Sequence, residues 1–426
     1  MNRTVTQHKR AAYPAYKPSG IEWLGEIPEH WEVYRLKTIT RLGYGDSLSA
    51  DDRIPGSYPV YGSNGVVGEH VQANTKAPCL IVGRKGSFGK VSYSNIPCFA
   101  IDTTYFIDDR FTSNDLRWLY YSLQWLRLDS FSKDSAVPGL SREDAYNNVL
   151  PFCQIDEQRS IAAFLDRETA RIDALIEKKR RQIELLKEKR SALISHAVTK
   201  GLDPNAKMKD SGIEWLGEIP EGWEVLPFKR LGDFQGGAGF PNDEQGCEEN
   251  ELPFYKVSDT NLHGNEIFMT VHNNAVSRET AQKLHAYIFP RDTIVFAKVG
   301  AALLLNKRRI LTQPACIDNN MMGFIRRTCE LMWAYFLMCS LDLSELANPG
   351  AVPSISEGQI RQLMLPVPPL PEQRAIAAFL DRETARIDAL IEKVEKSIEL
   401  LREYRTALIS AAVTGKIDVR KDIQHG

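Results

Sequence analysis

The chain is an internal duplication, and this feature constrains its fold more than any other. Residues 157–199 match residues 372–414 at a constant offset of 215, with 34 of 43 positions identical. A shorter match joins residues 17–33 to residues 209–225 at an offset of 192, with 15 of 17 positions identical. A period of roughly 200 residues is too long for a solenoid, whose units have about 20–50 residues. The chain therefore alternates variable and repeated segments.

The two variable segments, 34–156 and 226–371, have diverged strongly but keep faint signs of a common origin. The difference between the two offsets places 23 extra residues in the second segment. The pairs that keep the offset of 215 are Trp118 and Trp333, Ala136-Val137-Pro138 and Ala351-Val352-Pro353, and Leu150-Pro151 and Leu365-Pro366. We therefore expect two distant copies of one fold.

Each repeated segment is predicted to form one long helix. Apolar residues recur at steps of three, four and seven, with Glu, Lys and Arg between them. Asp156 can cap the first helix, Pro371 suits the first turn of the second, and Gly201 and Gly415 follow the two ends. At about 1.5 Å per residue, such a helix is a rod of roughly 60 Å.

An isolated rod of this kind would expose an apolar stripe, and its own twin offers the nearest complementary stripe. We predict antiparallel pairing within the chain, as an intramolecular coiled coil with a pseudo-two-fold axis. The residues expected to pack the helix pair are Leu165, Ile172, Ile176, Ile183, Leu186 and Leu193 in the first helix, and Leu380, Ile387, Ile391, Ile398, Leu401 and Leu408 in the second. The alternative is two separate amphipathic helices, each packed on its own domain.

Both variable segments have the composition of small β domains. Residues 54–107 and 252–325 are rich in Val, Ile, Tyr and Phe and are interrupted by Gly, Pro and Asn, which is typical of short strands and tight turns. A helix is expected near 118–126 and near 332–341. The predicted class is α+β, with two compact β cores joined by two long antiparallel helices. The expected segments, in the order domain, helix, domain, helix, are 1–156, 157–208, 209–371 and 372–426.

The composition is that of a globular protein. Hydrophobic residues make up 43% of the chain, and 53 Lys and Arg nearly balance 55 Asp and Glu. The net charge of −2 counts against a uniformly basic coat for nucleic acid but not against local basic patches. Seven scattered Cys without a Cys-x-x-Cys indicate a reducing compartment. The longest apolar stretch, 294–305, is too short to span a membrane, so we expect a cytoplasmic protein without a membrane partner.

No pattern of residues predicts a catalytic site. The run from Gly83 to Lys90 lacks the glycine spacing and the Ser or Thr of a Walker motif. The eight His are dispersed, none at metal-ligand spacing, and no order of Ser, His and Asp suggests a triad. Asp102 and Asp318 are better explained as turn formers or groove contacts than as catalytic acids. We predict no catalytic residue, no metal and no cofactor on this chain.

Basic and polar loops in both variable segments are suited to DNA. The run from Gly83 to Lys90 can bring backbone amides and cations to phosphates, although a purely structural turn is the alternative. In the second variable segment, a basic cluster precedes Asn residues whose side chains can pair with an adenine edge. The candidate DNA contacts are Tyr58, Tyr61, Ser63, Asn64, Arg84, Lys85, Ser87 and Lys90 in the first segment, and Lys256, Asn261, Lys298, Asn306, Lys307, Arg308, Asn319 and Asn320 in the second.

The alternation of variable and repeated segments resembles the specificity (S) subunit of type I restriction–modification enzymes. The motif Glu-Gln-Arg-x-Ile-Ala-Ala-Phe-Leu-Asp opens each repeat, at Glu157 and Glu372, and Gly-Ile-Glu-Trp-Leu-Gly-Glu-Ile-Pro precedes each variable segment. The resemblance covers nearly the whole chain. It implies a non-catalytic subunit with two target recognition domains, each reading one half of a bipartite double-stranded DNA sequence, and with the helices as a ruler between them.

The resemblance also implies partners. Two methyltransferase subunits and two restriction and translocase subunits are expected, so that S-adenosylmethionine, ATP and Mg belong to the partners and not to this chain. Repeated surfaces suit two copies of one partner. The candidate partner-facing residues are Glu22, Trp23 and Trp31 in the first copy, and Glu214, Trp215 and Trp223 in the second. The alternative function is a scaffold without DNA, whose β domains and coiled coil recruit paired partners.

Because the variable domains differ while the helices are repeated, we predict a DNA target with two different half-sites. The length of the spacer between the half-sites should follow the length of the helices. The helices differ most where Lys179-Arg180-Arg181-Gln182 stands against Val394-Glu395-Lys396-Ser397. This difference is either surface drift or a basic patch that favours the phosphates of the spacer on one side.

Overall fold

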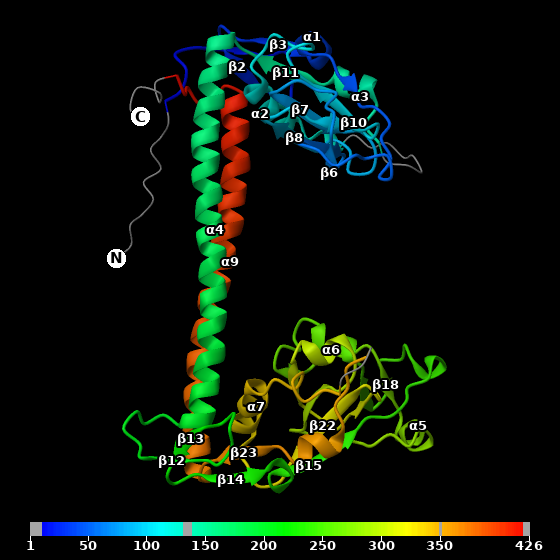
Figure 1. Ribbon diagram of the computed structural model, residues 1–426, viewed down its shortest axis with the longest axis vertical. Helices are drawn as coiled ribbons and strands as arrows, with labels where there is room; N and C mark the ends of the chain where they lie inside the picture. The colour runs from blue at the N-terminus through cyan, green and yellow to red at the C-terminus, as the bar shows by residue number, and fades with distance from the viewer. Residues whose placement is uncertain (1–10, 131–138, 349–351, 421–426) are drawn as a thin grey trace. The chain divides into compact units, whose positions relative to one another are not determined.

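The computed structural model describes residues 11–130, 139–348 and 352–420. The sequence echoes at 136–138 and at Ala351 lie outside the described residues. The chain forms two compact units that do not follow chain order, because unit 1 combines residues 1–180 with 395–426 and unit 2 consists of residues 181–394. Each unit holds one β domain and parts of both long helices, α4 (Ile155–Lys200) and α9 (Leu370–Val413) (Figure 1).

Unit 1 consists of short strands in three small sheets and one hairpin. The hairpin is β1 (Tyr16–Pro18) with β2 (Glu26–Pro28), and β3 (Glu32–Arg35) pairs with β11 (Val149–Phe152). The central sheet has the order β4-β10-β7-β8 and contains β4 (Gly43–Tyr44), β7 (Cys79–Gly83), β8 (Val91–Ser94) and β10 (Thr104–Ile107). The third sheet has the order β6-β5-β9 and contains β5 (Tyr58–Gly62), β6 (Gly65–His70) and β9 (Phe99–Ala100). The short helices are α1 (Leu36–Ile39), α2 (Leu116–Leu126), η1 (Leu128–Ser130) and α3 (Arg142–Asn147).

Unit 2 repeats this plan. The hairpin is β12 (Met208–Asp210) with β13 (Glu218–Pro220), and β14 (Glu224–Pro227) pairs with β23 (Met364–Val367). The central sheet has the order β15-β22-β19-β20-β17 and contains β15 (Gly232–Gly236), β17 (Phe268–Met269), β19 (Ile294–Ala297), β20 (Arg308–Leu311) and β22 (Met321–Arg326). The third sheet has the order β18-β16-β21 and contains β16 (Leu252–Tyr255), β18 (Ala275–Val276) and β21 (Cys316–Ile317). The short helices are η2 (Phe228–Arg230), η3 (Asn242–Glu244), η4 (Val257–Asn261), α5 (Arg278–Lys283), α6 (Ala301–Leu304), α7 (Leu331–Ser340) and α8 (Glu357–Arg361).

The two β domains are copies of one fold, as the sequence predicts. The strand orders β4-β10-β7-β8 and β15-β22-β19-β20 correspond one to one, and in both domains the third sheet contains one parallel pair, β5 with β9 and β16 with β21. The structure also locates the extra residues of the second copy. Sixteen residues separate β5 from β7, whereas 38 separate β16 from β19, and these contain β17, β18 and α5.

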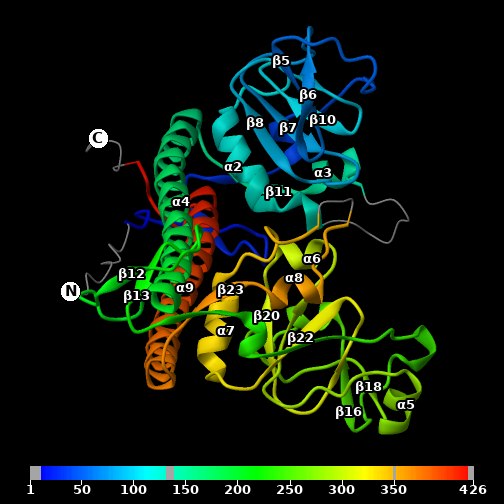
Figure 2. The ribbon, with the colours of Figure 1, turned by 60° about the horizontal axis from the view of Figure 1, so that its bottom comes forward.

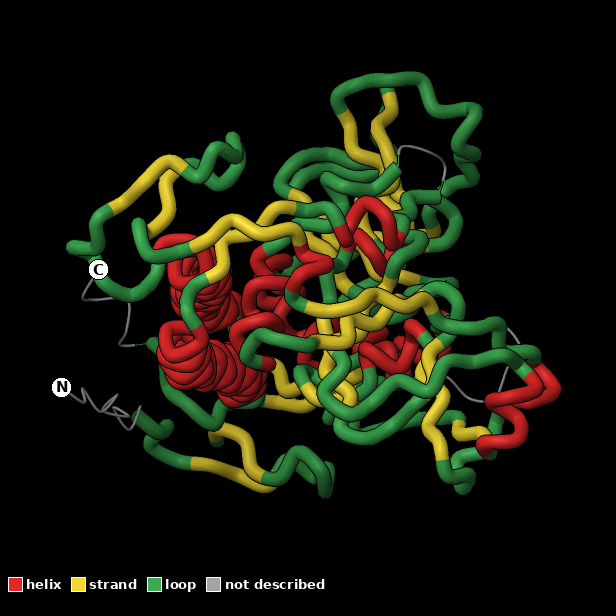
Figure 3. Tube along the Cα trace, turned by 90° about the horizontal axis from the view of Figure 1, so that it is seen from below, coloured by secondary structure: helices red, strands yellow, loops and turns green. Residues whose placement is uncertain are grey.

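The long helices pair with each other in an antiparallel arrangement. Within unit 1, Arg405 Nε of α9 donates to Asp173 Oδ1 of α4 at 3.0 Å. Within unit 2, Arg190 Nε of α4 donates to Asp388 Oδ1 of α9 at 3.0 Å, and these are the same two positions of the repeat with the helices exchanged. Figures 1 and 3 show α4 and α9 side by side. The alternative of two separate helices is therefore wrong.

The predicted seam residues are buried or half-buried on both helices. One row of seam positions runs through residues 165, 172, 179, 186 and 193 in steps of seven, with Leu or Ile at all of them except Lys179. Seven residues is the period of a left-handed coiled coil. Leu380 has a second role, because it also belongs to the buried core of unit 2. The helices start and stop close to the predicted points. Asp156 is the exception, since α4 begins at Ile155 and Asp156 lies within its first turn.

One seam position differs between the helices and gives a stability test. Lys179 is half-buried, whereas its counterpart Val394 is 8% exposed. A lysine at a seam position costs stability because its ammonium must stay hydrated. Lys179→Val should raise the free energy of unfolding by about 1 kcal/mol, measured by urea denaturation. The control Lys178→Val changes an exposed neighbour and should have no such effect; equal gains from both variants would contradict the assignment of the seam.

The neighbouring basic residues form ion pairs along the helix. Arg180 contacts Glu177 at 3.5 Å, and Arg181 contacts Glu184 at 2.7 Å and Glu188 at 3.7 Å. Acidic side chains of the same helix thus partly neutralise this cluster. That arrangement favours surface drift over a dedicated phosphate patch.

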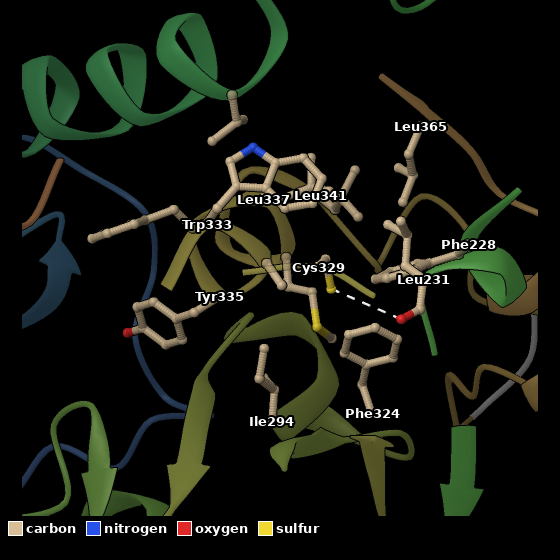
Figure 4. Packing of buried hydrophobic residues seen from close by; sticks show 14 of the residues in the cluster. Phe228, Leu231, Ile294, Phe324, Cys329, Trp333, Tyr335, Leu337, Leu341 and Leu365 are labelled. Atoms are coloured by element: carbon tan, nitrogen blue, oxygen red, sulfur yellow. Dashed lines mark hydrogen bonds between the residues drawn. The ribbon is translucent and has the colours of Figure 1, made fainter. Parts of the chain in front are cut away.

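A helix of each β domain packs against the long helices. In unit 1, α2 lies beside α4 (Figure 2). Arg117 Nε and the Tyr121 hydroxyl of α2 both donate to Asp166 Oδ1 of α4 at 2.6 Å. In unit 2, the contact is apolar and belongs to one continuous core. Figure 4 shows Trp333 of α7 pointing toward α4, whereas Ile294 and Phe324 of the central sheet lie beyond Cys329 in the same core. The same core includes Ile194, Ala197 and Val198 of α4 and Ile376, Ala377 and Leu380 of α9.

Candidate DNA and partner interfaces

Three connections between strands meet on each β domain, and they carry most of the predicted DNA contacts. In unit 1 they follow β5, β7 and β9, and in unit 2 the corresponding connections follow β16, β19 and β21. We call each set of three the loop cluster of its domain. In unit 1 the loop cluster consists of residues 63–64, 84–90 and 101–103, and in unit 2 of residues 256–261, 298–307 and 318–320.

Hydrogen bonds join the three connections in unit 1. Lys90 Nζ donates to the carbonyl of Asn64 at 2.6 Å and to its Oδ1 at 2.9 Å. Ser63 Oγ donates to the carbonyl of Thr103 at 2.6 Å, and Arg84 donates to the carbonyl of Asp102 at 3.1 Å. The close turn needs glycine, since a Cβ on Gly83 would lie 2.4 Å from the carbonyl oxygen of Ser87. The exposed Lys85 and Ser87 lie on this turn.

The two predicted tyrosines of β5 are less available than the loop residues. Tyr58 and Tyr61 are half-buried, and Tyr61 packs against the cluster of Cys79, Ile81 and Cys98. Burial raises the pKa of the Tyr61 hydroxyl above its ordinary value. These two residues therefore shape the base of the loop cluster and offer part of a side chain to a ligand.

The structure adds two residues that the sequence reasoning missed. Tyr44 is 47% exposed, and two guanidinium groups lie near its ring, with Arg142 at 4.0 Å and Arg84 at 5.0 Å from the centroid. An arginine held over an aromatic ring is oriented for contact with a base or a phosphate. No local signal marks this site, because Arg142 lies 98 residues from Tyr44 in sequence.

The corresponding connections of unit 2 also meet. The Lys307 ammonium donates to Asn261 Oδ1, the Lys298 amide donates to the carbonyl of Asn320 at 2.8 Å, and the Val257 amide donates to Asp318 Oδ2 at 3.2 Å. Asn319 and Asn320 are exposed at the tip of the β21–β22 turn.

The side chains of three residues around this cluster have structural contacts. Lys256 Nζ donates to Gln245 Oε1 at 2.8 Å. Lys298 reaches over Gly236, where a Cβ would lie 2.9 Å from its Nζ. Asp318 orders the turn by accepting from the Asn320 amide at 2.9 Å, as a turn former does, and burial raises its pKa.

Arg308 and Asn306 are a correction to the predicted contacts. Arg308 is 2% exposed and lies over the Phe296 ring at 5.3 Å, so its guanidinium is not on the surface. Burial lowers its pKa to about 10. Asn306 adopts a left-handed backbone with φ of 50°, accepts a bond from Arg308 at 3.1 Å and donates to Asp342 at 2.7 Å. Asn306 thus holds the turn, and neither residue is suited to reading base edges.

The predicted partner-facing residues divide into an exposed set and a buried pair. Trp23 and Trp215 are 62% and 51% exposed, and Glu22 and Glu214 beside them are exposed too. Trp31 and Trp223, however, are buried at 0% and 1%. The prediction that these two face a partner is wrong, because each hairpin folds its second tryptophan against the end of a long helix.

That packing explains the glycines that follow the long helices. Gly201 and Gly415 have φ of 79° and 70°, and a Cβ there would lie 3.3 Å from Trp223 and 3.2 Å from Trp31, respectively. A lysine at the end of α4 (Lys200) or just beyond the end of α9 (Lys416) also holds each hairpin. Lys416 Nζ donates to the carbonyls of Leu24 at 3.3 Å and Glu26 at 2.6 Å, and Lys200 Nζ makes the equivalent bonds in unit 2, to Leu216 at 2.9 Å and to Glu218.

The repeated Glu-Gln-Arg motif joins each β domain to its helix. Gln158 accepts from the Asp115 amide at 3.0 Å, and Gln373 accepts from the Glu330 amide at 2.8 Å, so each holds the start of α2 or α7. The glutamates meet the hairpins, with Glu372 accepting from Trp223 Nε1 at 3.0 Å and Glu157 from the Tyr13 hydroxyl at 2.8 Å. The motif is therefore structural.

Repeated leucines on the helix pair are exposed to a similar degree in both copies. Leu175 and Leu390 are 40% and 42% exposed, and Leu185 and Leu400 are 49% and 57% exposed. Leu175 and Leu400 lie in unit 1, whereas Leu390 and Leu185 lie in unit 2. Each unit thus presents the same two leucines of the repeat, one from each helix.

Among the described residues, no group of three or more His, Cys, Asp or Glu is placed to hold a metal ion. Within the same residues, no helix has both the length and the apolar character needed to cross a bilayer.

Comparison with known sequences decides the family. The profile described as "Type I restriction modification DNA specificity domain" matches residues 28–185 and 220–400, which together are most of the chain. The chain belongs to this family. The MjaVIII specificity subunit of Methanocaldococcus jannaschii is 25% identical over 92% of this chain and 94% of its own length. The EcoKI specificity subunit of Escherichia coli is 25% identical over 47% of this chain and 44% of its own length.

Solved structures share the fold. The HsdS subunit from Thermoanaerobacter tengcongensis superposes with a TM-score of 0.51 at 15% identity, covering 92% of this chain and 98% of its own. A chain from a study of complex assembly and conformational transition in a type I restriction–modification system superposes with a TM-score of 0.69 at 15% identity, covering 91% and 98%.

This specificity subunit is a non-catalytic component that supplies DNA specificity to a type I system. The cofactors of the system reside on the methyltransferase and restriction subunits. Family membership decides against the alternative of a scaffold without DNA.

Proposed function

We propose that the loop cluster of each β domain reads one half of an asymmetric, bipartite DNA target. One observation carries this proposal. The same three connections meet on both domains and offer different residues, such as the exposed Lys85 and Ser87 in unit 1 against the exposed Asn319 and Asn320 in unit 2. A shared frame with different loop residues is what two different half-sites require, because base readout depends on the side chains at the groove.

We further propose that two copies of the methyltransferase subunit dock on the repeated surfaces, and that two restriction subunits join through them. Two equivalent surfaces bind two copies of one partner most simply. The paired exposure of Trp23 with Trp215, and of Leu175 with Leu390, supports this stoichiometry. The division into domains 1–156 and 209–371 with helical segments 157–208 and 372–426, and a cytoplasmic location, stay predictions.

Exchange of one variable segment tests the proposed readout. Residues 34–156 are replaced by the corresponding segment of another specificity subunit, and methylated adenines are sequenced in cells that express the chain with its methyltransferase. One half of the methylated motif should change completely while the other half stays the same. The exchanged segment contains the whole loop cluster of unit 1 and no residue of the loop cluster of unit 2.

Exchange of residues 226–371 is the matched control and should change the other half alone. A motif that changes in both halves after either exchange would contradict separate readout. The absence of any methylated motif that depends on the chain would contradict the proposed function as a whole.

A further inference from the structure

Unit 2 contains a basic groove between its β domain and α4, next to the loop cluster. The groove has a volume of about 560 Å³ and runs between β20 and α7 on one side and α4 on the other. Arg190 of α4 and Lys307, Arg308 and Arg309 of the β domain line it, together with the single carboxylate Glu266. Four cations therefore face one acidic side chain of the lining.

The positive charge of this groove is only partly compensated. Arg308 is 2% exposed, and its hydrogen bonds go to Asn306 Oδ1 and to the carbonyls of Lys307 and Leu341. Arg309 is half-buried and donates to the carbonyls of Arg308 and Thr260, each at 2.8 Å.

The Nε atoms of both arginines are buried without a hydrogen-bond partner in the described part of the chain. Burial lowers the pKa of both guanidinium groups. Asp388 accepts from Arg190 and so compensates that one cation of the groove, whereas Asp342 accepts from Asn306 and Ser344. Buried cations without full compensation are stabilised by an incoming anion.

Unit 1 has a groove at the corresponding place. It has a volume of about 910 Å³ and includes Tyr120, Gln124 and Thr406, the counterparts at an offset of 215 of Tyr335, Cys339 and Ser191 in the unit 2 groove. Lys90 and Arg127 line it, together with the single carboxylate Asp129. The groove thus recurs at the same place in both units, and in each it borders the loop cluster, with residues 86–90 in unit 1 and Asn306 and Lys307 in unit 2.

We propose that these grooves bind the sugar-phosphate backbone of the DNA target, independently of its sequence. A groove present in both units should bind something that both half-sites contain. Because the half-sites differ in sequence, the part of the DNA that they share is the phosphate backbone. In unit 2, Lys307 belongs to both the loop cluster and the groove, so a strand whose bases are read at the loops has its phosphates within reach of the groove. This inference rests on the proposed function.

The salt dependence of binding tests the assignment. Lys307→Gln and Arg309→Gln are made singly and together, and the complex of the chain with its methyltransferase is titrated with duplex DNA at several salt concentrations. Each lost phosphate contact lowers the slope of log K against log salt by about 0.9, so a fourfold rise in salt should weaken binding by the double variant about tenfold less than binding by the parent. Arg309→Gln alone should leave the methylated motif unchanged, because Arg309 lies outside the loop cluster.

The matched control is Lys283→Gln, whose side chain is 76% exposed on α5, outside the groove. A slope for the double variant equal to that of the control would overturn the inference, and so would a motif altered by Arg309→Gln alone, since that outcome assigns the groove to base readout. Stabilisation of the free chain by inorganic phosphate with an unchanged slope would assign the groove to a free anion and overturn it too. Each of these results leaves the proposed function standing, because that proposal fails only if the parent chain confers no motif.

Discussion

Trp333→Ala should lower the opening free energy of unit 2 by about 3–5 kcal/mol, the range for removal of a large buried aromatic side chain. Trp333 is fully buried at the point where α7 meets α4, and its core includes Ile194 of α4 and Ile376 of α9 (Figure 4). A cavity there loosens the β domain and the helix contact together. Hydrogen exchange of the β19 and β22 amides measures the loss, because it reports the opening of unit 2 by itself.

Trp333→Phe separates packing from hydrogen bonding. The indole N–H of Trp333 has no hydrogen-bond partner in the described residues, so phenylalanine loses part of the ring and no bond. Trp333→Phe should lower the opening free energy of unit 2 by less than half of the loss caused by Trp333→Ala. Trp118→Ala, at the counterpart position in unit 1, should speed hydrogen exchange of the β7 and β10 amides and leave exchange of the β19 amides unchanged. Equal losses for Phe and Ala at position 333 would mean that the indole N–H makes a bond in solution.

The helix pair was predictable from sequence because its information is periodic. A strict seven-residue repeat specifies one packed face, and duplication supplies a matching face, so residues such as Ile172 and Ile387 could be placed without coordinates. The β domains were predictable only as a class. Sheet order depends on pairings distant in sequence, such as β3 with β11, and short strands carry too little pattern to specify them.

Sequence identity between the two copies could not show which repeated residues are buried and which are exposed. Trp23 and Trp31 are equally repeated, but only folding of the hairpin against the end of α9 buries the second of them. The basic run at 306–309 looked like one surface patch, although strand β20 turns Arg308 inward and leaves Arg309 half-buried. Tyr44 with Arg142 was missed because a pair so distant in sequence has no local signature.

Leu175→Glu combined with Leu400→Glu should reduce the number of bound methyltransferase subunits from two to one. Both leucines lie on the part of the helix pair in unit 1, at 40% and 57% exposure. If a partner covers them, a carboxylate at each position must be buried without a counter-charge, which costs several kcal/mol and weakens that docking surface at least about a hundredfold. The repeated surface of unit 2, with Leu390 and Leu185, is untouched and should keep its partner. Native mass measurement of the assembled complex counts the copies.

The pair Leu390→Glu and Leu185→Glu should give the same count, and all four changes together should leave no stable complex. Arg180→Glu is the matched control, because it also places a glutamate on exposed α4, at a position where the other copy already has Glu395. If two identical methyltransferase subunits dock on the two repeats, docking cannot depend on a position whose residue differs between the repeats. The Arg180→Glu variant should therefore still bind two methyltransferase subunits. Because the four leucines are exposed, their replacement should change the stability of the free chain by about 0.5 kcal/mol at most. A complex that keeps two methyltransferase copies after all four changes would place the docking surface elsewhere, with the exposed Trp23 and Trp215 as the next repeated pair to change.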